Sequence, residues 1–282
     1  MPTVSRDRYD ALIFDLDGTL LDGRSKLSAA VKAEIDRVRR LGYLVVLATG
    51  RSLGGTKEVY RELGLDTEVV CYNGAWIGRP DGGAPWHYTP IPDDLIADLG
   101  GAEAHAGFHY RHHLEAKYTA TTAHPHHARV SRWYTNVVHV DPAVATLPAR
   151  ELLRVSLFFD DEPRNESGWN ALPAHARERL HREVFPLSIF PDFHDVGLVL
   201  CEVQVKGRGK AEALRYLAER HGVPAARVVA VGDQRNDLPM LEGAGLAVAM
   251  GNAVPEAKAL ADLVIGDHRE DGVARFLADA VR

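Results

Sequence analysis

The first eighty residues alternate short apolar runs with amphipathic stretches. Short apolar runs with polar borders are typical of buried strands, and they predict strands at 11–14, 44–48 and 69–72. Between the first two runs, Ser28 is a candidate helix N-cap, and Gly42 lies where a helix end favours a left-handed residue. The apolar residues between them recur at helical spacing: Val31, Ile35 and Val38. This repeat predicts an α/β fold with a doubly wound parallel sheet that carries helices on both faces.

The same alternation returns near the C-terminus. Strands are predicted at 228–231, 246–250 and 263–265. Helices are predicted at 211–221, 238–244, 257–260 and 273–281. We therefore expect the two ends of the chain, 1–81 and 206–282, to build one Rossmann-like core domain.

The middle of the chain, 82–205, is richer in histidine, proline and aromatic residues. Its predicted strands are 108–111, 137–140, 152–159 and 196–203. Its predicted helices are 93–103 and 174–184, and 160–168 is predicted to be a polar loop. We interpret this region as an inserted α/β domain, with linkers near 79–85 and 204–207.

Composition narrows the class of protein. The 282 residues are 46% hydrophobic and 26% charged with a net charge of −6, which is typical of a soluble globular protein and argues against nucleic-acid binding. No apolar stretch is long enough to span a bilayer, and the first ten residues have no secretory apolar segment. Cys71 and Cys201 lie in apolar stretches and are expected to be buried, reduced thiols. We expect a cytoplasmic protein without membrane or nucleic-acid partners; its oligomeric state is open.

A pair of carboxylates directly follows the first predicted strand. The segment 15–19 (DLDGT) has a chance frequency on the order of 10⁻⁵ per position, and ligands of open α/β sheets bind at this end of the strands. Asp15 and Asp17 would repel each other without a cation, and a hard divalent ion such as Mg²⁺ suits both carboxylates and phosphate. A calcium loop is excluded because its sixth and twelfth positions are Leu20 and Lys26. A solvated acidic turn is the simpler alternative for this motif alone.

Two weaker motifs fit phosphate binding. Thr49 and Gly50 follow the second strand, where a hydroxyl and backbone N–H groups suit a phosphoryl group. Lys210 opens a predicted helix and could place a positive charge on the same group. Taken singly, a structural turn and a surface lysine are the simpler explanations.

A second acidic cluster follows the strand at 228–231. Asp233 could complete a magnesium site with Asp15, and Asp237 could be a ligand or support one. A helix N-cap is the alternative for this motif. All four motifs follow a strand or open a helix, so the predicted fold brings them to one sheet edge, which favours a common site.

These motifs resemble those of the haloacid dehalogenase-like superfamily. The matching positions are Asp15-x-Asp17-Gly-Thr, Thr49, Lys210 and Gly232-Asp233-x-x-Asn236-Asp237. Further segments look like the Cof-type sugar-phosphatase branch: 71–75 (CYNGA), 250–253 (MGNA) and 270–274 (EDGVA). The chain departs from the common pattern at Ala211, often glycine, and at Gln234 and Arg235. The resemblance implies a hydrolase core with an inserted cap that closes over the site and selects the leaving group.

The resemblance also implies an activity and a role for each motif residue. The expected activity is Mg²⁺-dependent hydrolysis of small phosphorylated metabolites, sugar phosphates above all, through an aspartyl phosphate on Asp15. Asp17 would be the acid and base, and its backbone carbonyl would bind the metal. The other implied metal ligands are Asp15, Asp233 and Asp237. The implied phosphate-binding residues are Thr49, Gly50, Lys210 and Asn236, and Thr49 and Lys210 also count as catalytic.

Three alternatives stay open at this point. A phosphomutase of the phosphomannomutase type would use the same core, and a sugar-phosphate-binding module would have lost turnover. A metal site in the inserted domain is conceivable, but the histidine spacing favours surface or half-buried side chains. The histidines in question are His105, His109, His112, His113, His124, His126 and His127.

Overall fold

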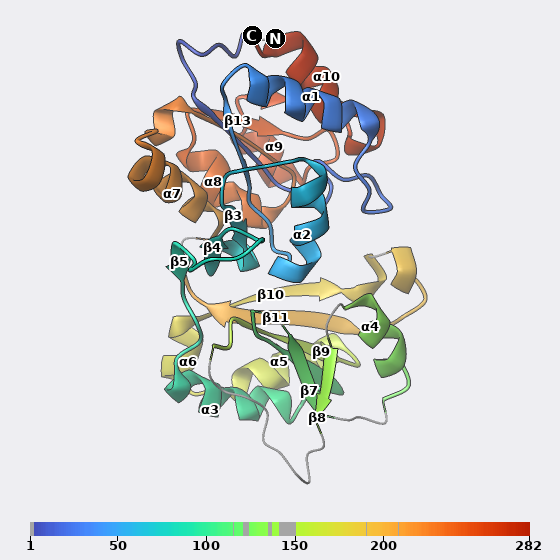
Figure 1. The fold of residues 1–282 in the computed structure, drawn as a ribbon. Coiled ribbons are helices and arrows are strands. Elements are labelled where there is room, and N and C mark those ends of the chain that lie inside the picture. Colours follow the sequence, from blue (N-terminus) through green and yellow to red (C-terminus); the bar gives the residue numbers. More distant parts are fainter. Residues whose placement is uncertain are drawn as a thin grey trace. The chain divides into compact units, whose positions relative to one another are not determined.

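The computed structural model describes residues 3–114, 116–120, 124–134, 137–140, 151–189, 191–207 and 209–282. The chain divides into two compact units (Figure 1). The core unit comprises Met1–Arg51, Thr56–His87 and Arg208–Arg282, and the inserted unit comprises Ser52–Gly55 and Tyr88–Gly207. The functional domain boundaries expected at 81/82 and 205/206 stay a prediction.

The core unit is built on a five-stranded parallel sheet in the order β14-β13-β12-β1-β2. Its strands are β1 (Ala11–Phe14), β2 (Leu44–Leu47), β12 (Val228–Gly232), β13 (Leu246–Ala249) and β14 (Leu263–Val264). The central strands are apolar and almost wholly buried. This is typical of a parallel sheet that is covered on both faces, as the sequence predicts.

The direction of the chain through this sheet changes at its centre. From β1 the chain moves outward to β2, and from β12 it moves the other way to β13 and β14. Right-handed crossovers then put the connecting helices on opposite faces of the sheet. The helices of the core unit are α1 (Ala29–Arg40), most of α2 (Leu53–Glu62), α7 (Glu212–His221), α8 (Leu238–Gly243), α9 (Pro255–Leu260) and α10 (Gly272–Ala280). The switch point between β1 and β12 is where ligands of such sheets bind.

Helix α1 shows how local sequence sets the element boundaries. The hydroxyl of Ser28 accepts a hydrogen bond from the backbone N–H of Val31 at 3.1 Å, and the chain leaves the helix through Gly42 at φ +90°. Val31, Ile35 and Val38 are buried, and α1 packs against α10 (Figure 1). The predicted cap, helix face and helix end are confirmed.

The third predicted strand exists, but it belongs to another sheet. Strand β3 (Val69–Cys71) pairs antiparallel with β4 (Trp76–Gly78), which neighbours β5 (His87–Tyr88). It joins the segment just after β2 through an isolated parallel bridge between Ala48 and Val70. The reason is the sharp turn at Tyr72–Gly74, which returns the chain beside β3.

The inserted unit has a six-stranded sheet in the order β10-β11-β9-β6-β7-β8. Its strands are β6 (Phe108–His112), β7 (Lys117–Ala120), β8 (Val137–Val140), β9 (Arg154–Phe159), β10 (Leu180–Pro186) and β11 (Val199–Val205). Its helices are α3 (Asp93–Glu103), α4 (His127–Trp133), α5 (Glu162–Asn170) and α6 (Ala174–Arg179). One apolar cluster joins α3 to β9 and β11 through residues such as Leu95, Leu157 and Cys201. The predicted inserted α/β fold is confirmed.

Two element predictions in this unit are wrong. The predicted loop at 160–168 is largely helix α5, which begins at the Asp161 cap and fully buries only Asn165 and Gly168. It therefore has no apolar stripe to reveal it. The predicted helix at 174–184 stops at Arg179, because the chain from Leu180 pairs with β11 as an edge strand. Pairing with a distant strand overrides the local helical pattern.

Two further features are the state of the cysteines and the length of the helices. Cys71 and Cys201 are buried and form no disulfide bond, as predicted. In the residues that the structure describes, no helix is both long and apolar enough to cross a membrane.

Candidate active site

Three parallel strands deliver polar residues to the same edge of the core sheet. Phe14 at the end of β1 lies opposite Val231 of β12 and Leu47 of β2. The chain continues in register for one more residue, since the N–H of Asp15 donates to the carbonyl of Val231 at 3.0 Å. Asp15, Thr49 and Asp233 therefore follow neighbouring strands at the switch point of the sheet.

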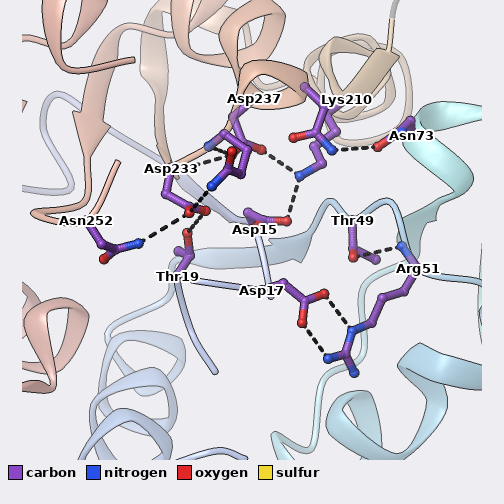
Figure 2. Close-up of polar contacts among 12 residues, drawn as sticks. Asp15, Asp17, Thr19, Thr49, Arg51, Asn73, Lys210, Asp233, Asp237 and Asn252 are labelled. Carbon is purple, nitrogen blue, oxygen red and sulfur yellow. Dashed lines mark hydrogen bonds and ion pairs between the residues drawn. The ribbon is translucent and has the colours of Figure 1, made fainter. Parts of the chain in front are cut away.

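Lys210 lies at the centre of this edge. Its Nζ atom is 2.6 Å from Oδ1 of Asp15 and 2.6 Å from Oδ1 of Asp237 (Figure 2). The lysine side chain is 1% exposed, and a short 3₁₀ turn, Gly209–Ala211, places it just ahead of α7. An ammonium group that is buried between two buried carboxylates excludes the alternative that Lys210 is an ordinary surface lysine.

Asp237 supports both Lys210 and its own turn. Its second oxygen, Oδ2, accepts the backbone N–H groups of Asp233 and Gln234, each at 2.8 Å. The turn packs so closely that a Cβ atom on Gly232 would lie 2.5 Å from Cγ of Asp237. Because both oxygens already accept hydrogen bonds, a supporting role is the simpler one for Asp237, and its assignment as a metal ligand stays a prediction.

Asp233 is held by three side chains. Its Oδ1 accepts from the hydroxyl of Thr19 at 3.3 Å, and its Oδ2 accepts from the amides of Gln234 at 3.0 Å and Asn252 at 3.2 Å (Figure 2). Asn252 also donates to the carbonyl of Gly18 at 2.9 Å, so it joins the loop after β1 to Asp233. These contacts fix a carboxylate that is 2% exposed.

The acidic cluster has the donors that a divalent cation needs. One carboxylate oxygen from each of Asp15, Asp233 and Asp237 lies within 4.8 Å of the others, and no comparable group occurs among the described residues, the inserted histidines included. Lys210 balances only one of the three carboxylates. Hard oxygen donors with excess negative charge fit Mg²⁺.

Burial shapes the protonation of the cluster. It raises the pKa of Asp15 well above its usual range and that of Asp233 to about 7, with nearby carboxylates adding to both effects. Burial disfavours the charged form of Lys210, but Asp15 and Asp237 outweigh it and raise the lysine pKa. Lys210 therefore stays a cation, and a bound divalent cation would favour the charged forms of the two aspartates.

The predicted phosphate-binding residues meet beside this cluster. Thr49 is 1% exposed, and Nδ2 of Asn236 donates to Oδ1 of Asn73 at 3.2 Å. A Cβ atom on Gly50 would lie 3.1 Å from Oδ1 of Asn73 and 3.6 Å from Nδ2 of Asn236. Gly50 and Asn236 thus approach each other across Asn73.

The side chain of Asp17 stands apart from the acidic cluster. It is 55% exposed and forms a two-pronged ion pair with Arg51, whose Nε and Nη2 atoms lie 2.7 and 2.5 Å from its oxygens (Figure 2). The backbone next to it does approach the cluster, since a Cβ on Gly18 would lie 2.5 Å from Oδ2 of Asp233. Gly18 also has a φ of +81°. Glycine is therefore required both by the lack of space for a Cβ atom and by the left-handed backbone.

Comparison with known proteins identifies the family of this chain. A family model described as haloacid dehalogenase-like hydrolase matches residues 12–277. The chain belongs to this family. The predicted superfamily and its Cof-type branch are confirmed.

Several named relatives of this haloacid dehalogenase-like hydrolase are phosphatases. The 5-amino-6-(5-phospho-D-ribitylamino)uracil phosphatase YitU of Bacillus subtilis is 29% identical, with 95% of this chain and 96% of that protein covered. The pyridoxal phosphate phosphatase YbhA of Escherichia coli is 29% identical, with 94% and 96% covered. A solved haloacid dehalogenase-like hydrolase of Bacteroides thetaiotaomicron shares the fold, with 24% identity, a TM-score of 0.80, and 96% and 99% covered. The predicted class, a phosphoric monoester hydrolase for small phosphorylated molecules, is confirmed.

Sequence reasoning missed four residues of the candidate site. They are Thr19, Arg51, Asn73 and Asn252. Each of these residues lies in or beside a motif named in the sequence analysis. The signal that could have found them is that each motif follows an apolar strand. Their partners lie far away in sequence, so their contacts depend on the folded sheet.

Proposed function

We propose that this hydrolase is a Mg²⁺-dependent phosphatase that acts on small phosphorylated metabolites, sugar phosphates among them, through an aspartyl phosphate on Asp15. The supporting observation is Lys210, buried between Asp15 and Asp237 at the switch point and beside Asp233. This arrangement places a fixed cation and an acidic cation site around one buried carboxylate. A transferring phosphoryl group needs such charge stabilisation and positioning.

The chemistry that follows uses the described residues. A carboxylate oxygen of Asp15 attacks phosphorus, a P–O bond to Asp15 forms, and the P–O bond to the leaving group breaks. Lys210, the Thr49 hydroxyl, the Gly50 N–H and the Asn236 amide face the phosphoryl oxygens. Water then cleaves the acyl phosphate and releases inorganic phosphate. When bound by Asp15, Asp233 and the Asp17 carbonyl, Mg²⁺ supplies further neutralisation of negative charge.

The direct test is product analysis with purified protein. Incubation with a panel of phosphorylated metabolites should release inorganic phosphate when Mg²⁺ is present, and a chelator should stop the release. An isomerised sugar phosphate in place of inorganic phosphate would identify a phosphomutase. Failure to hydrolyse p-nitrophenyl phosphate and every metabolite tested would contradict the proposal in favour of a binding module.

Asp17 is proposed to be the general acid that protonates the leaving group, and Arg51 to orient it. We expect Asp17→Asn to slow hydrolysis of alkyl phosphates by roughly 10²–10⁴-fold. Hydrolysis of p-nitrophenyl phosphate should fall much less, because nitrophenolate needs little protonation to leave. Steady-state kinetics on both substrates measures the difference. Asp36→Asn, a change at a partly exposed position on α1 whose side chain pairs with Arg40, is the control and should alter neither rate. Equal losses on the two substrates would exclude the acid role.

Mg²⁺ affinity should depend on pH. Burial first, and Asp237 second, raise the pKa of Asp233 in the metal-free protein to about 7. Below that pH the cation must displace a proton, so affinity should weaken by up to about tenfold for each unit of falling pH and level off above it. Calorimetric titration with Mg²⁺ between pH 5.5 and 8.5 measures this. A dissociation constant that stays the same across the range would refute the assignment of Asp233 to the cation.

We also propose that the inserted unit, 82–205 by sequence, is the cap that selects the leaving group. Support comes from its place in the chain after β3 and β4 and from its independent core. Exchange of this unit with that of a relative should change substrate preference and keep the pH and metal dependence.

A further inference from the structure

The turn after β3 has an unusual backbone. Tyr72, Asn73 and Gly74 all have positive φ angles, of 52°, 50° and 94°. Left-handed backbone is costly for residues other than glycine, although asparagine tolerates it better than most. Such strain persists where the surrounding structure holds it, and it concentrates at functional sites.

This turn contacts two of the loops that carry proposed phosphate-binding groups. The N–H of Asn73 donates to the carbonyl of Thr49 at 3.1 Å, and the N–H of Tyr72 donates to that of Arg51 at 3.0 Å. On the other side, a Cβ atom on Gly74 would lie 2.3 Å from the carbonyl oxygen of Gly209, directly before Lys210. The turn therefore fits between the Thr49 loop and the Lys210 turn without spare room.

The side chain of Asn73 reaches a third loop. It is 6% exposed, and its Oδ1 accepts the hydrogen bond from Nδ2 of Asn236 at 3.2 Å. The amide of Asn73 can lie this close to the Thr49 loop because Gly50 has no Cβ atom. One side chain thus contacts both Gly50 and Asn236.

We propose that Asn73 is a positioning residue that holds Asn236 and the Thr49–Gly50 backbone in the arrangement that receives the phosphoryl group. The residue type fits this role on two counts. Aspartate also tolerates a left-handed backbone, but its charge would repel a phosphoryl group; glycine tolerates it too, but has no side chain to contact Asn236. The inference rests on the proposed phosphatase function and deepens it.

Two substitutions separate positioning from stability. Asn73→Gly keeps the backbone and removes the side chain; Asn73→Asp keeps the shape and adds charge. Ser25→Gly is the matched control, because Ser25 is exposed, also left-handed at φ 56°, and contacts none of the groups named above. The readouts are the dissociation constant for inorganic phosphate in Mg²⁺, measured by calorimetry, the KM and kcat of a substrate that the wild type hydrolyses, and the melting temperature.

We expect Asn73→Gly to weaken phosphate binding and raise KM by about tenfold with a smaller change in kcat, and Asn73→Asp to weaken binding further. Ser25→Gly should leave all three constants unchanged, and the melting temperatures of Ser25→Gly and Asn73→Gly should stay near that of the wild type. Wild-type phosphate affinity and KM in Asn73→Gly would overturn the inference and leave the proposed function standing. If Asn73→Gly does not fold, Asn73→Asp with wild-type constants overturns it equally. A wild-type protein that releases no phosphate from any substrate would overturn the proposed function instead.

Discussion

The Asp15→Asn variant should lose turnover of every substrate by about 10⁴-fold or more and keep a folded core that is at least as stable as that of the wild type. Activity is lost because an amide oxygen cannot form the acyl phosphate. Stability is kept because Asp15 is a buried carboxylate: burial, together with Asp237 and Asp233, disfavours its ionised form by more than Lys210 favours it. A neutral side chain removes this penalty, and Lys210 keeps Asp237 as its partner.

The two halves of this prediction need separate measurements. Single-turnover assays should detect no covalent phosphate in Asp15→Asn, and urea unfolding in chelator should give a free energy at or above the wild-type value. Asp36→Asn on α1 is the matched control and should retain activity. Substantial turnover by Asp15→Asn would show that another residue is the nucleophile. Severe destabilisation would show that the Asp15 carboxylate, rather than Asp237, compensates the charge of Lys210.

The Lys210→Met variant should lose both activity and stability. The lysine is 1% exposed and separates carboxylates that are 5% and 0% exposed, so its removal leaves buried anions without compensation. Breaking a buried ion pair from one side costs about 3–5 kcal/mol. The expected loss is therefore of that size in metal-free buffer, and part of it should be recovered on adding Mg²⁺, which supplies positive charge to the same carboxylates.

Urea unfolding with and without Mg²⁺ measures this effect. Lys206→Met, an exposed change nearby in sequence, should alter neither stability nor activity by a measurable amount. A Lys210→Met protein that unfolds at the wild-type urea concentration in chelator would show that the carboxylates are protonated there and need no cation.

Features that depend on local sequence were predictable. The strands that carry the site are uninterrupted apolar runs, and the cap of α1 at Ser28 is a local hydrogen bond, so both follow from pattern. The acidic motifs were predictable because parallel strands end at one edge of the sheet. The meeting of Asp15, Lys210 and Asp233 thus required only the topology.

Features that depend on distant partners were not predictable. Leu180–Pro186 continues a helical pattern and becomes a strand only because β11 lies beside it. Arg51 looked like one more residue of a turn, yet its guanidinium meets Asp17 across 34 positions of the chain. Asn252 bridges Gly18 and Asp233 in the same way. No window of neighbouring residues contains such contacts.

Asp237 connects the buried Lys210 to the backbone of its own loop, and this restricts how the protein can change over evolution. The carboxylate holds Lys210 with one oxygen and two backbone N–H groups with the other. In a related protein that no longer catalyses the reaction, loss of Lys210 alone would leave the Asp237 carboxylate buried without a cation. Loss of Asp237 alone would leave Lys210 with less compensation and would remove two hydrogen bonds that hold the loop. Inactive members of such a lineage should therefore have replaced Lys210 and Asp237 together, whereas Asp15 is free to drift alone.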